Sequence, residues 1–315
     1  MGLILLLVLF FSIGSCKKDV LEDMTIDEPI DTTGNNDSTV VDTNEVMTCN
    51  GYTSLCNLRY NSVAYATTHN AHASLVYGFS TLSANQFLSA TEQLNAGVRC
   101  LNIKTYYTDD SNCGSLGHYL YHGFPTLGCI KVIDFLTEVK TWLDDNPHEL
   151  VTFTIEGSSS LSHLQNSFSA AGFDSLMYQH TSITDDWPTL KEMIISDKRV
   201  VVFTSRGSTN SSYTGFHDYW DYTFGNDYAA GSRVDFECTL DNRGNPNGNL
   251  FLFNHFITKT TPQRDSARAI NSNPFFVSRA EMCNQQIGHM PNFVMVDFFG
   301  EGNVFEVVKQ LNGVN

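Results

Sequence analysis

The sequence predicts an α/β fold, a single (β/α)8 TIM barrel over residues 48–315, and three observations support this prediction. Short apolar runs alternate with longer amphipathic stretches, which is the pattern of strand and helix units repeated around a parallel sheet. Eight such runs fall within roughly 250 residues, the usual length of an eight-stranded barrel. Polar side chains follow the ends of these runs, where a barrel of this kind carries its active site.

The predicted strands are short and bounded by turn residues. In chain order they are Ser62–Thr68, Val98–Lys104, Tyr119–His122, Leu150–Ile155, Arg199–Thr204, Asp227–Val234, Leu250–Asn254 and Phe293–Phe298. The sixth has the weakest pattern, because residues 207–231 are rich in glycine and aromatic side chains without a clear period. Helices are predicted between the strands, among them Ser83–Asn95, Val132–Asp145 and Ser162–Ala171. Asn146 and Pro147 form a stop signal after the second of these helices.

The N-terminal residues are predicted to be a targeting segment. The apolar run from Leu3 to Ile13 is shorter than the roughly 20 residues that a membrane-spanning helix needs. Gly14, Ser15 and Cys16 follow it and resemble the cleavage box of bacterial lipoproteins, in which the cysteine receives diacylglycerol. We therefore expect a lipoprotein signal peptide at 1–15 and a lipidated Cys16. The protein would then be anchored in the cell envelope, at the outer membrane or cell surface, and an ordinary secreted protein is the alternative.

Residues 16–47 are predicted to be a disordered tether between Cys16 and the barrel. Nine acidic residues and no basic one lie between Asp19 and Met47, so this stretch cannot bury enough apolar surface to fold. The whole chain has 34 acidic and 18 basic residues, a formal net charge of −16 that would repel a polyanion. We expect no nucleic-acid partner, and a monomer, since no pattern indicates oligomerisation.

Eight cysteines behind an export signal indicate disulfides rather than metal thiolates. With Cys16 assigned to lipid, the short separations predict bridges Cys49–Cys56 and Cys113–Cys129, and Cys238–Cys283 is the expected third. Cys100 is left over. It lies in an apolar strand pattern, so we expect a buried, inert thiol.

Polar side chains cluster at the predicted strand ends. They are His69, Asn70, Asn102, Lys104, His122, Glu156, Arg206, Asn254, His255 and Asp297. A single polar residue at a strand end is usually structural, so the prediction of a site rests on their coincidence at one rim. Side chains alternate along a strand, so Asn102 and Lys104 share a face and can both point into the barrel mouth.

These residue types suit the cleavage of a phosphodiester. Two histidines can accept and donate a proton near neutral pH, because an unperturbed imidazole has a pKa of about 6.5. Lys104, with Arg206 as a second candidate, can supply positive charge to phosphoryl oxygens without a metal ion. A calcium site would need several carboxylate or carbonyl oxygens, and Lys104 inserts a cation among them.

The order of these residues resembles a known family. The segments that carry the resemblance are Thr67–Asn70, Gln93–Lys104, Tyr121–Gly123, Phe135–Glu156, Asn254–Phe256 and Pro291–Phe298. They look like the X domain of phosphatidylinositol-specific phospholipase C, in the secreted, disulfide-containing branch found in plants, fungi and bacteria. The resemblance covers nearly all of residues 49–315.

The resemblance implies roles for four residues. His69 would be the general base that deprotonates the attacking hydroxyl, and His122 the general acid that protonates the leaving alkoxide. Asp297 would orient and charge-stabilise His69, and Lys104 would stabilise the phosphate. The substrate would be a phosphatidylinositol-like phospholipid or another phosphodiester, cleaved through a cyclic phosphate.

The resemblance also bears on metal dependence and substrate binding. Asn102 and Lys104 stand where calcium-dependent relatives usually carry an acidic residue, and the Lys resembles the basic side chain that metal-free bacterial enzymes use in place of the ion. No cofactor is therefore expected; calcium held by Asn70 and Glu156 is the alternative. The residues expected to bind substrate are Asn70, Asn102, Glu156, Arg206, Asn254 and His255. The loop 203–221 could select the head group or pack as a loop core; its aromatic residues are Phe203, Tyr213, Phe216, Tyr219 and Trp220.

Two other functions remain open at this stage. A glycerophosphodiester phosphodiesterase is a related barrel, but its metal-binding acidic residues would conflict with Asn102 and Lys104. A surface-tethered binding lipoprotein could keep the barrel without turnover. The presence of both His69 and His122 favours an enzyme.

Overall fold

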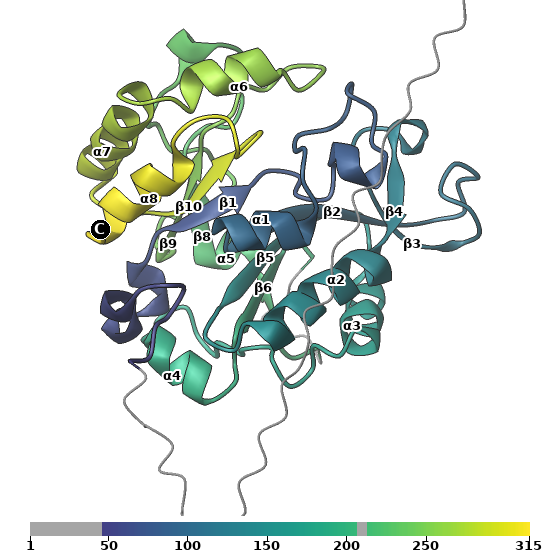
Figure 1. Cartoon of the computed structure of the whole chain (residues 1–315), viewed down its shortest axis with the longest axis horizontal. Coiled ribbons are helices and arrows are strands. Elements are labelled where there is room, and N and C mark those ends of the chain that lie inside the picture. The colour runs from purple at the N-terminus through teal and green to yellow at the C-terminus, as the bar shows by residue number, and fades with distance from the viewer. Residues whose placement is uncertain (1–45, 207–212) are drawn as a thin grey trace, which may run out of the picture. The chain divides into compact units, whose positions relative to one another are not determined.

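The computed structural model describes residues 46–206 and 213–315 (Figure 1). The predicted signal peptide, the lipidated Cys16 and nearly all of the acidic tether therefore lie outside the described residues. Within the described part of the chain, no helix has both the length and the apolar character needed to cross a bilayer.

A curled sheet of eight parallel strands forms the centre of the described chain and confirms the predicted α/β barrel fold (Figure 1). Its order is β7–β6–β5–β2–β1–β10–β9–β8. In chain order the strands are β1 (Tyr65–Thr68), β2 (Cys100–Thr108), β5 (Val151–Gly157), β6 (Val200–Thr204), β7 (Phe216–Asp218), β8 (Thr223–Gly225), β9 (Leu250–Asn254) and β10 (Pro291–Val296). Among the described residues no ladder joins β7 to β8, so the barrel is open between these two edge strands.

Two of the predicted strands need correction. The third, Tyr119–His122, forms β3 (Gly117–Tyr121), which pairs antiparallel with the end of β2 and with β4 (Cys129–Lys131), away from the barrel path. The sixth, Asp227–Val234, is wrong, because this segment is a loop that leads into a short 3-10 helix at Arg233–Asp235. The strands β7 and β8 lie before it and have three residues each, which is too short for a period to show in the sequence.

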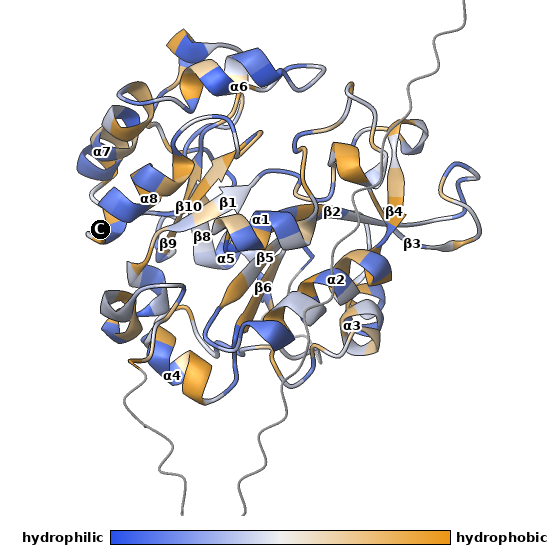
Figure 2. Cartoon of the chain, viewed as in Figure 1, coloured by the Kyte–Doolittle hydropathy of each residue, from blue (hydrophilic) through white to orange (hydrophobic). Residues whose placement is uncertain are grey.

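Helices follow most of the strands and alternate hydrophilic and hydrophobic residues (Figure 2). They are α1 (Ala90–Ala96), α2 (Val132–Asp145), α3 (Leu161–Ala170), α4 (Leu190–Ile195), α5 (Tyr219–Tyr222), α6 (Arg264–Ile270), α7 (Phe275–Ile287) and α8 (Val304–Asn312). Short 3-10 helices span Thr53–Asn57, Tyr60–Ser62, Leu75–Tyr77, Pro125–Leu127 and Arg233–Asp235. Helix α2 has its predicted bounds. Helix α1 begins later than predicted, because Ser89 and Glu92 form a capping box there.

The sheet separates two apolar cores. Leu101 and Ile103 of β2 pack on the helix side with α2, whereas Cys100 belongs to the cluster that fills the barrel interior. This alternation is the one predicted for β2, and it directs Asn102 and Lys104 inward.

All three predicted disulfides form: Cys49–Cys56, Cys113–Cys129 and Cys238–Cys283. Cys100 is free and fully buried, as predicted. Burial raises the pKa of its thiol to about 12, so it stays protonated and unreactive at neutral pH.

Candidate active site

His69 and Asp297 meet because their strands are neighbours in the sheet. Strands β1 and β10 pair in parallel with Thr68 opposite Val296, so the next residue of each strand lies at the same rim. Nδ1 of His69 is 2.8 Å from Oδ1 of Asp297. A carboxylate oxygen accepts hydrogen bonds, so Nδ1 carries the proton and Nε2 keeps a lone pair.

His122 approaches His69 from the hairpin outside the barrel. It follows β3, and its Nδ1 donates to the Ser83 carbonyl at 2.8 Å, which leaves Nε2 for the pocket. The ring centroids of His69 and His122 are 6.5 Å apart. Burial lowers the pKa of His122 below its ordinary value, and the nearby His69 and Lys104 lower it further, although the Ser83 carbonyl and Asp297 act in the opposite direction.

Lys104 and Glu156 face each other across the β2–β5 ladder. Nζ of Lys104 is 3.9 Å from Oε2 of Glu156, and both side chains are partly exposed to the pocket. The amide of Asn102 donates to Oε1 of the same carboxylate at 3.1 Å, and also to Oγ1 of Thr154 at 3.1 Å. Glu156 is thus held by one amide and lies close to one cation.

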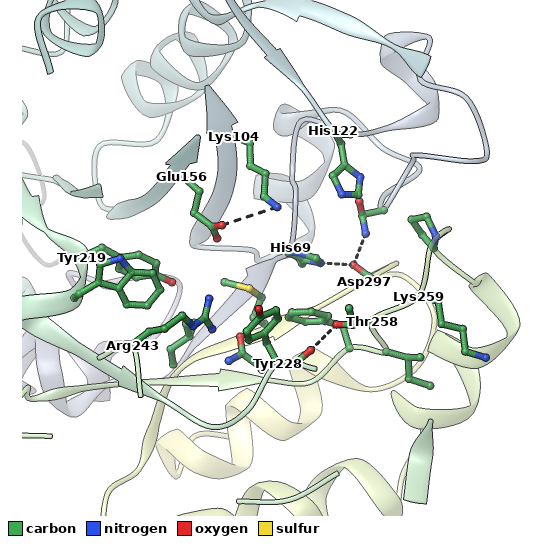
Figure 3. A pocket seen from close by; sticks show the side chains of 18 residues that line it. His69, Lys104, His122, Glu156, Tyr219, Tyr228, Arg243, Thr258, Lys259 and Asp297 are labelled. Carbon is green, nitrogen blue, oxygen red and sulfur yellow. Dashed lines mark hydrogen bonds and ion pairs between the residues drawn. The ribbon is translucent and has the colours of Figure 1, made fainter. Parts of the chain in front are cut away.

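These side chains line a pocket of about 310 Å³, a size that suits a small polar head group (Figure 3). The predicted site residues that it brings together are His69, Lys104, His122, Glu156, Asn254 and Asp297. Tyr219 and Trp220 also line it, as the loop prediction allowed. Phe203 and Phe216, from the same loop region, are instead buried in the cores.

Four other predicted substrate-binding residues do not line this pocket. Asn70 and Asn102 are fully buried behind its wall, where the backbone N–H of Asn70 donates to Oδ1 of Asn102 at 3.1 Å. Arg206 is outside the described pocket lining, and its Nε donates to the Gly157 carbonyl at 3.4 Å. These positions give no direct support to a substrate contact.

His255 is also turned away from the pocket, because side chains alternate at the end of β9. Asn254 points inward, and His255 points outward and stacks on Phe276 of α7 with centroids 3.9 Å apart. Its Nε2 donates to the Ile270 carbonyl at 3.1 Å, and Nδ1 accepts from Arg279 at 2.9 Å. Burial, followed by the charge of Arg279, lowers the pKa of His255, so we assign it a structural place in the core.

Several pocket residues were not among those predicted from the sequence. They include Asn85, Tyr228, Arg243, Thr258 and Lys259. Arg243 lies in the loop between β8 and β9, away from any predicted strand end, and its guanidinium is 3.9 Å from the Tyr228 ring centroid. Asn85 falls inside the range predicted as a helix, and it donates to the Asp297 carboxylate.

The described residues contain no cluster of three or more His, Cys, Asp or Glu side chains that could hold a metal ion. The carboxylate of Glu156 has the ammonium of Lys104 at 3.9 Å and accepts from the amide N–H of Asn102 at 3.1 Å, and both groups carry hydrogens where calcium would need oxygen ligands.

Comparison with known proteins places the chain in a family. The family model described as PI-PLC X 1 matches residues 55–312. A PI-PLC X domain-containing protein of the fungus Arthroderma benhamiae is 29% identical over 288 residues, which cover 85% of this chain and 90% of that protein. A PI-PLC X domain-containing protein of Arabidopsis thaliana is 32% identical over 286 residues, 83% of this chain and 64% of that protein.

Solved structures share the fold. The phosphatidylinositol-specific phospholipase C of Listeria monocytogenes superimposes with a TM-score of 0.57 at 17% identity, covering 82% of this chain and 95% of that chain. The enzyme of Staphylococcus aureus gives a TM-score of 0.54 at 12% identity over the same shares. At these identities the likeness concerns the fold alone. The match of the family model over most of the described chain shows that this protein belongs to the PI-PLC X domain family.

Proposed function

We propose that this protein cleaves phosphatidylinositol-like phosphodiesters by general base and acid catalysis. The observation that carries the proposal is the pair of imidazoles, His69 and His122, whose ring centroids lie 6.5 Å apart in one pocket with Lys104. Each ring uses Nδ1 for a fixed hydrogen bond, so Nε2 is the nitrogen of each ring that would take part in chemistry; on His69 it accepts from Nδ2 of Asn70, which the substrate hydroxyl would displace. A phosphoryl group between the two rings would be reached from both sides.

In the proposed reaction Nε2 of His69 accepts the proton of a head-group hydroxyl, and that oxygen attacks the adjacent phosphorus. The bond from phosphorus to the diacylglycerol oxygen breaks, and protonated His122 gives its proton to that oxygen. The products are a cyclic phosphodiester of the head group and diacylglycerol. Lys104 stabilises the negative charge on the non-bridging oxygens, and Asp297 stabilises the imidazolium that forms at His69.

As a general acid His122 must be protonated, but in the free protein its surroundings favour the neutral ring. Burial, His69 and Lys104 lower its pKa, so the free imidazole is mostly neutral at pH 7. A bound phosphodiester carries one negative charge, which favours the protonated form of His122. Substrate binding would therefore be coupled to uptake of a proton.

We also propose that the reaction needs no metal ion. Lys104 would supply the positive charge, since its ammonium and the Asn102 amide face Glu156 where a calcium ion would need oxygen ligands. A calcium-dependent enzyme, with Asn70 and Glu156 as ligands, is disfavoured further because Asn70 is buried behind the pocket wall.

The proposed place of action is a membrane surface outside the cytoplasm. Disulfides are typical of exported proteins, and an uncharacterized relative in Arthroderma benhamiae is named a secreted protein. Anchoring through a lipidated Cys16 would hold the barrel near phospholipid. Mass spectrometry of the mature N-terminus tests the anchor, because a diacylglyceryl cysteine has a characteristic mass.

The first test is hydrolysis of phosphatidylinositol vesicles by purified protein in the presence of a chelator. Release of a soluble phosphorylated head group is expected, and we expect H69A and H122A to lower the rate by at least about 100-fold while remaining folded. Activity that appears after calcium is added would overturn the metal-free proposal. Cleavage of glycerophosphodiesters in place of phosphatidylinositol would favour the alternative enzyme, and tight binding without turnover would favour a binding protein.

A further inference from the structure

Two consecutive buried amide side chains link the strand ends that carry His69 and Asp297, two residues far apart in the sequence. Asn85 and Gln86 belong to the loop between β1 and α1 and are 2% and 0% exposed. We refer to this pair as the Asn85–Gln86 clasp. Its contacts fall on the ends of β1 and β10, where the proposed base and its carboxylate partner emerge.

Gln86 holds the backbone of both strand ends. Its Nε2 donates to the carbonyl of His69 at 2.9 Å and to the carbonyl of Val296 at 3.1 Å. Its Oε1 accepts from the backbone N–H of Phe299 at 3.2 Å. One side chain therefore fixes the spacing between the two strands at the point where the site begins.

Asn85 reaches the reacting groups themselves. Its Nδ2 donates at 2.8 Å to Oδ1 of Asp297, the same oxygen that accepts from His69. Its Oδ1 accepts from Nδ2 of Asn70 at 3.1 Å, and its backbone carbonyl accepts from the N–H of Phe298 at 2.8 Å. Asn85 thus orients the carboxylate from two directions, through the side chain of Asp297 and through the turn that follows it.

The contacts close into a ring around His69. Asn70 has a φ of 47°, a left-handed conformation that asparagine tolerates, and its Nδ2 lies 3.1 Å from Nε2 of His69. The ring runs from His69 to Asp297, to Asn85, to Asn70 and back to His69, so both imidazole nitrogens have a partner. An arriving hydroxyl would displace Asn70 from Nε2, and Oδ1 of Asn85 is the acceptor that would retain the Asn70 amide.

We propose that Asn85 is a positioning residue for the proposed base, because it orients the carboxylate of Asp297 and, through Asn70, the group that contacts Nε2 of His69. The inference rests on the proposed function of His69. A carboxylate that is nearly buried needs hydrogen-bond donors to remain ionised, and Asn85 supplies one of the two that Oδ1 of Asp297 accepts.

The first test compares two buried amides. Asn85→Ala should lower kcat roughly 10- to 100-fold and change KM much less. Asn85 lines the pocket but is only 2% exposed, and both polar atoms of its side chain are engaged by Asp297 and Asn70. Asn292→Ala is the matched control. Asn292 is equally buried and makes three hydrogen bonds with Phe251, Asn61 and Val63, but it lies at the opposite end of β10. This control should lower Tm and leave kcat of the folded protein unchanged.

The second test is a pH profile that a merely structural residue would not move. Asn85→Asp puts a second carboxyl group against Asp297, so the two share a proton at low pH and place extra negative charge beside His69 at higher pH. Both effects move the acid limb of kcat/KM to higher pH, by about one unit. Other titratable or charged groups surround His69, and the substitution leaves them in place. His122, Lys104, Glu156, Arg243, Lys259, Tyr219 and Tyr228 line the same pocket, and His72 lies near the ring.

The outcomes separate this inference from the proposed function. Suppose that the wild-type protein is active. The positioning role is then overturned if Asn85→Ala has the same kcat as Asn292→Ala, or if the acid limb of Asn85→Asp is that of the wild type. An inactive wild-type protein would overturn the proposed function instead. The clasp is then tested by NMR: the titration of the His69 ring should move to higher pH in Asn85→Asp, and an unchanged titration would contradict the inference.

Discussion

His122 experiences opposing electrostatic influences, and this makes its titration a sensitive test of the site. Burial, His69 and Lys104 favour the neutral ring, whereas the Ser83 carbonyl and Asp297 favour the protonated ring. The net effect lowers its pKa, so a reaction that needs protonated His122 should decline as pH rises at a lower pH than for an ordinary histidine.

Replacing Lys104 by Met removes one of the charges that lower the pKa of His122. The pKa of His122 should then rise, so the descending limb of kcat/KM should move to higher pH. The variant also lacks the ammonium that would stabilise the phosphate, so kcat should fall by roughly 100-fold. Rates measured between pH 5 and 9 would show both effects. Lys259→Met is the control, since Lys259 lines the same pocket but is not among the groups that shift His122.

A Lys104→Met profile whose descending limb stays in place, or moves to lower pH, would contradict the assignment of that limb to His122. If Lys259→Met moved the limb by the same amount, the effect would belong to the net charge of the pocket and not to Lys104.

At the residue scale, the polar residues that follow predicted strands identified part of the site. His69 and Asp297 follow neighbouring parallel strands, so a sequence pattern sufficed to place them at one rim. The same pattern was wrong for His255, because the register of a strand decides which side chains at its end point inward. It also missed Asn85, since an asparagine in a loop has the same appearance in the sequence whether it binds solvent or a buried carboxylate.

At the scale of elements, the hairpin formed by β3 and β4 carries His122 to the site from outside the barrel. The sequence pattern of Tyr119–His122 is that of a short apolar strand, and such a run does not distinguish parallel pairing in a barrel from antiparallel pairing in a hairpin. The position of His122 therefore depends on the hairpin geometry more than on the barrel.

The disulfide Cys113–Cys129 fixes this hairpin and encloses His122 in the loop between its two cysteines. The double variant C113S/C129S should lower the free energy of unfolding by up to about 3 kcal/mol, because a bridge over a loop of this length restricts the unfolded chain by that amount. It should also lower kcat roughly 10-fold, because His122 is less firmly placed opposite His69.

Kinetics at a temperature well below Tm, together with chemical denaturation, separate the two effects. The matched control is C49S/C56S, which removes a bridge near the start of the described chain and should affect stability without lowering kcat. An equal loss of kcat in both double variants would show that the Cys113–Cys129 bridge acts through general stability and not through His122.

At the scale of the whole molecule, the fold and family were predictable because six barrel strands (β1, β2, β5, β6, β9 and β10) and the motifs at their ends follow one another in the expected order along the chain. The catalytic activity is a separate matter, since one barrel scaffold supports unrelated functions. The edges of the sheet were not predictable: β7 and β8 have three residues each, and their place in the order is set by pairing with β6 and β9 and not by local sequence.

The surface beside His122 has a composition that suits the proposed membrane substrate. Residues 72–88 and 117–128 contain no Asp, Glu, Lys or Arg in a chain of net charge −16. The two segments lie side by side, because the N–H of Ser80 and the hydroxyl of Ser83 both donate to the Leu127 carbonyl. Leu82 is 56% exposed and Phe124 is 70% exposed on this surface, so two large apolar side chains lie together on an uncharged surface.

We expect Leu82 and Phe124 to insert into the lipid interface when the protein acts on vesicles. The double variant L82S/F124S should bind phosphatidylcholine vesicles containing phosphatidylinositol at least roughly 10-fold more weakly, because fully burying even one such side chain contributes about 1.5–3 kcal/mol. Sedimentation with vesicles, carried out in an H69A background, measures binding without turnover. Ile195→Ser is the control, since Ile195 is 69% exposed on α4, away from both segments.

In the background with His69 intact, hydrolysis of vesicles should fall in L82S/F124S, whereas hydrolysis of a water-soluble short-chain phosphodiester should not. If the rate of hydrolysis falls equally for both substrates, the two side chains act in the reaction and not in membrane binding. If L82S/F124S and Ile195→Ser bind vesicles equally well, this surface does not contact the membrane.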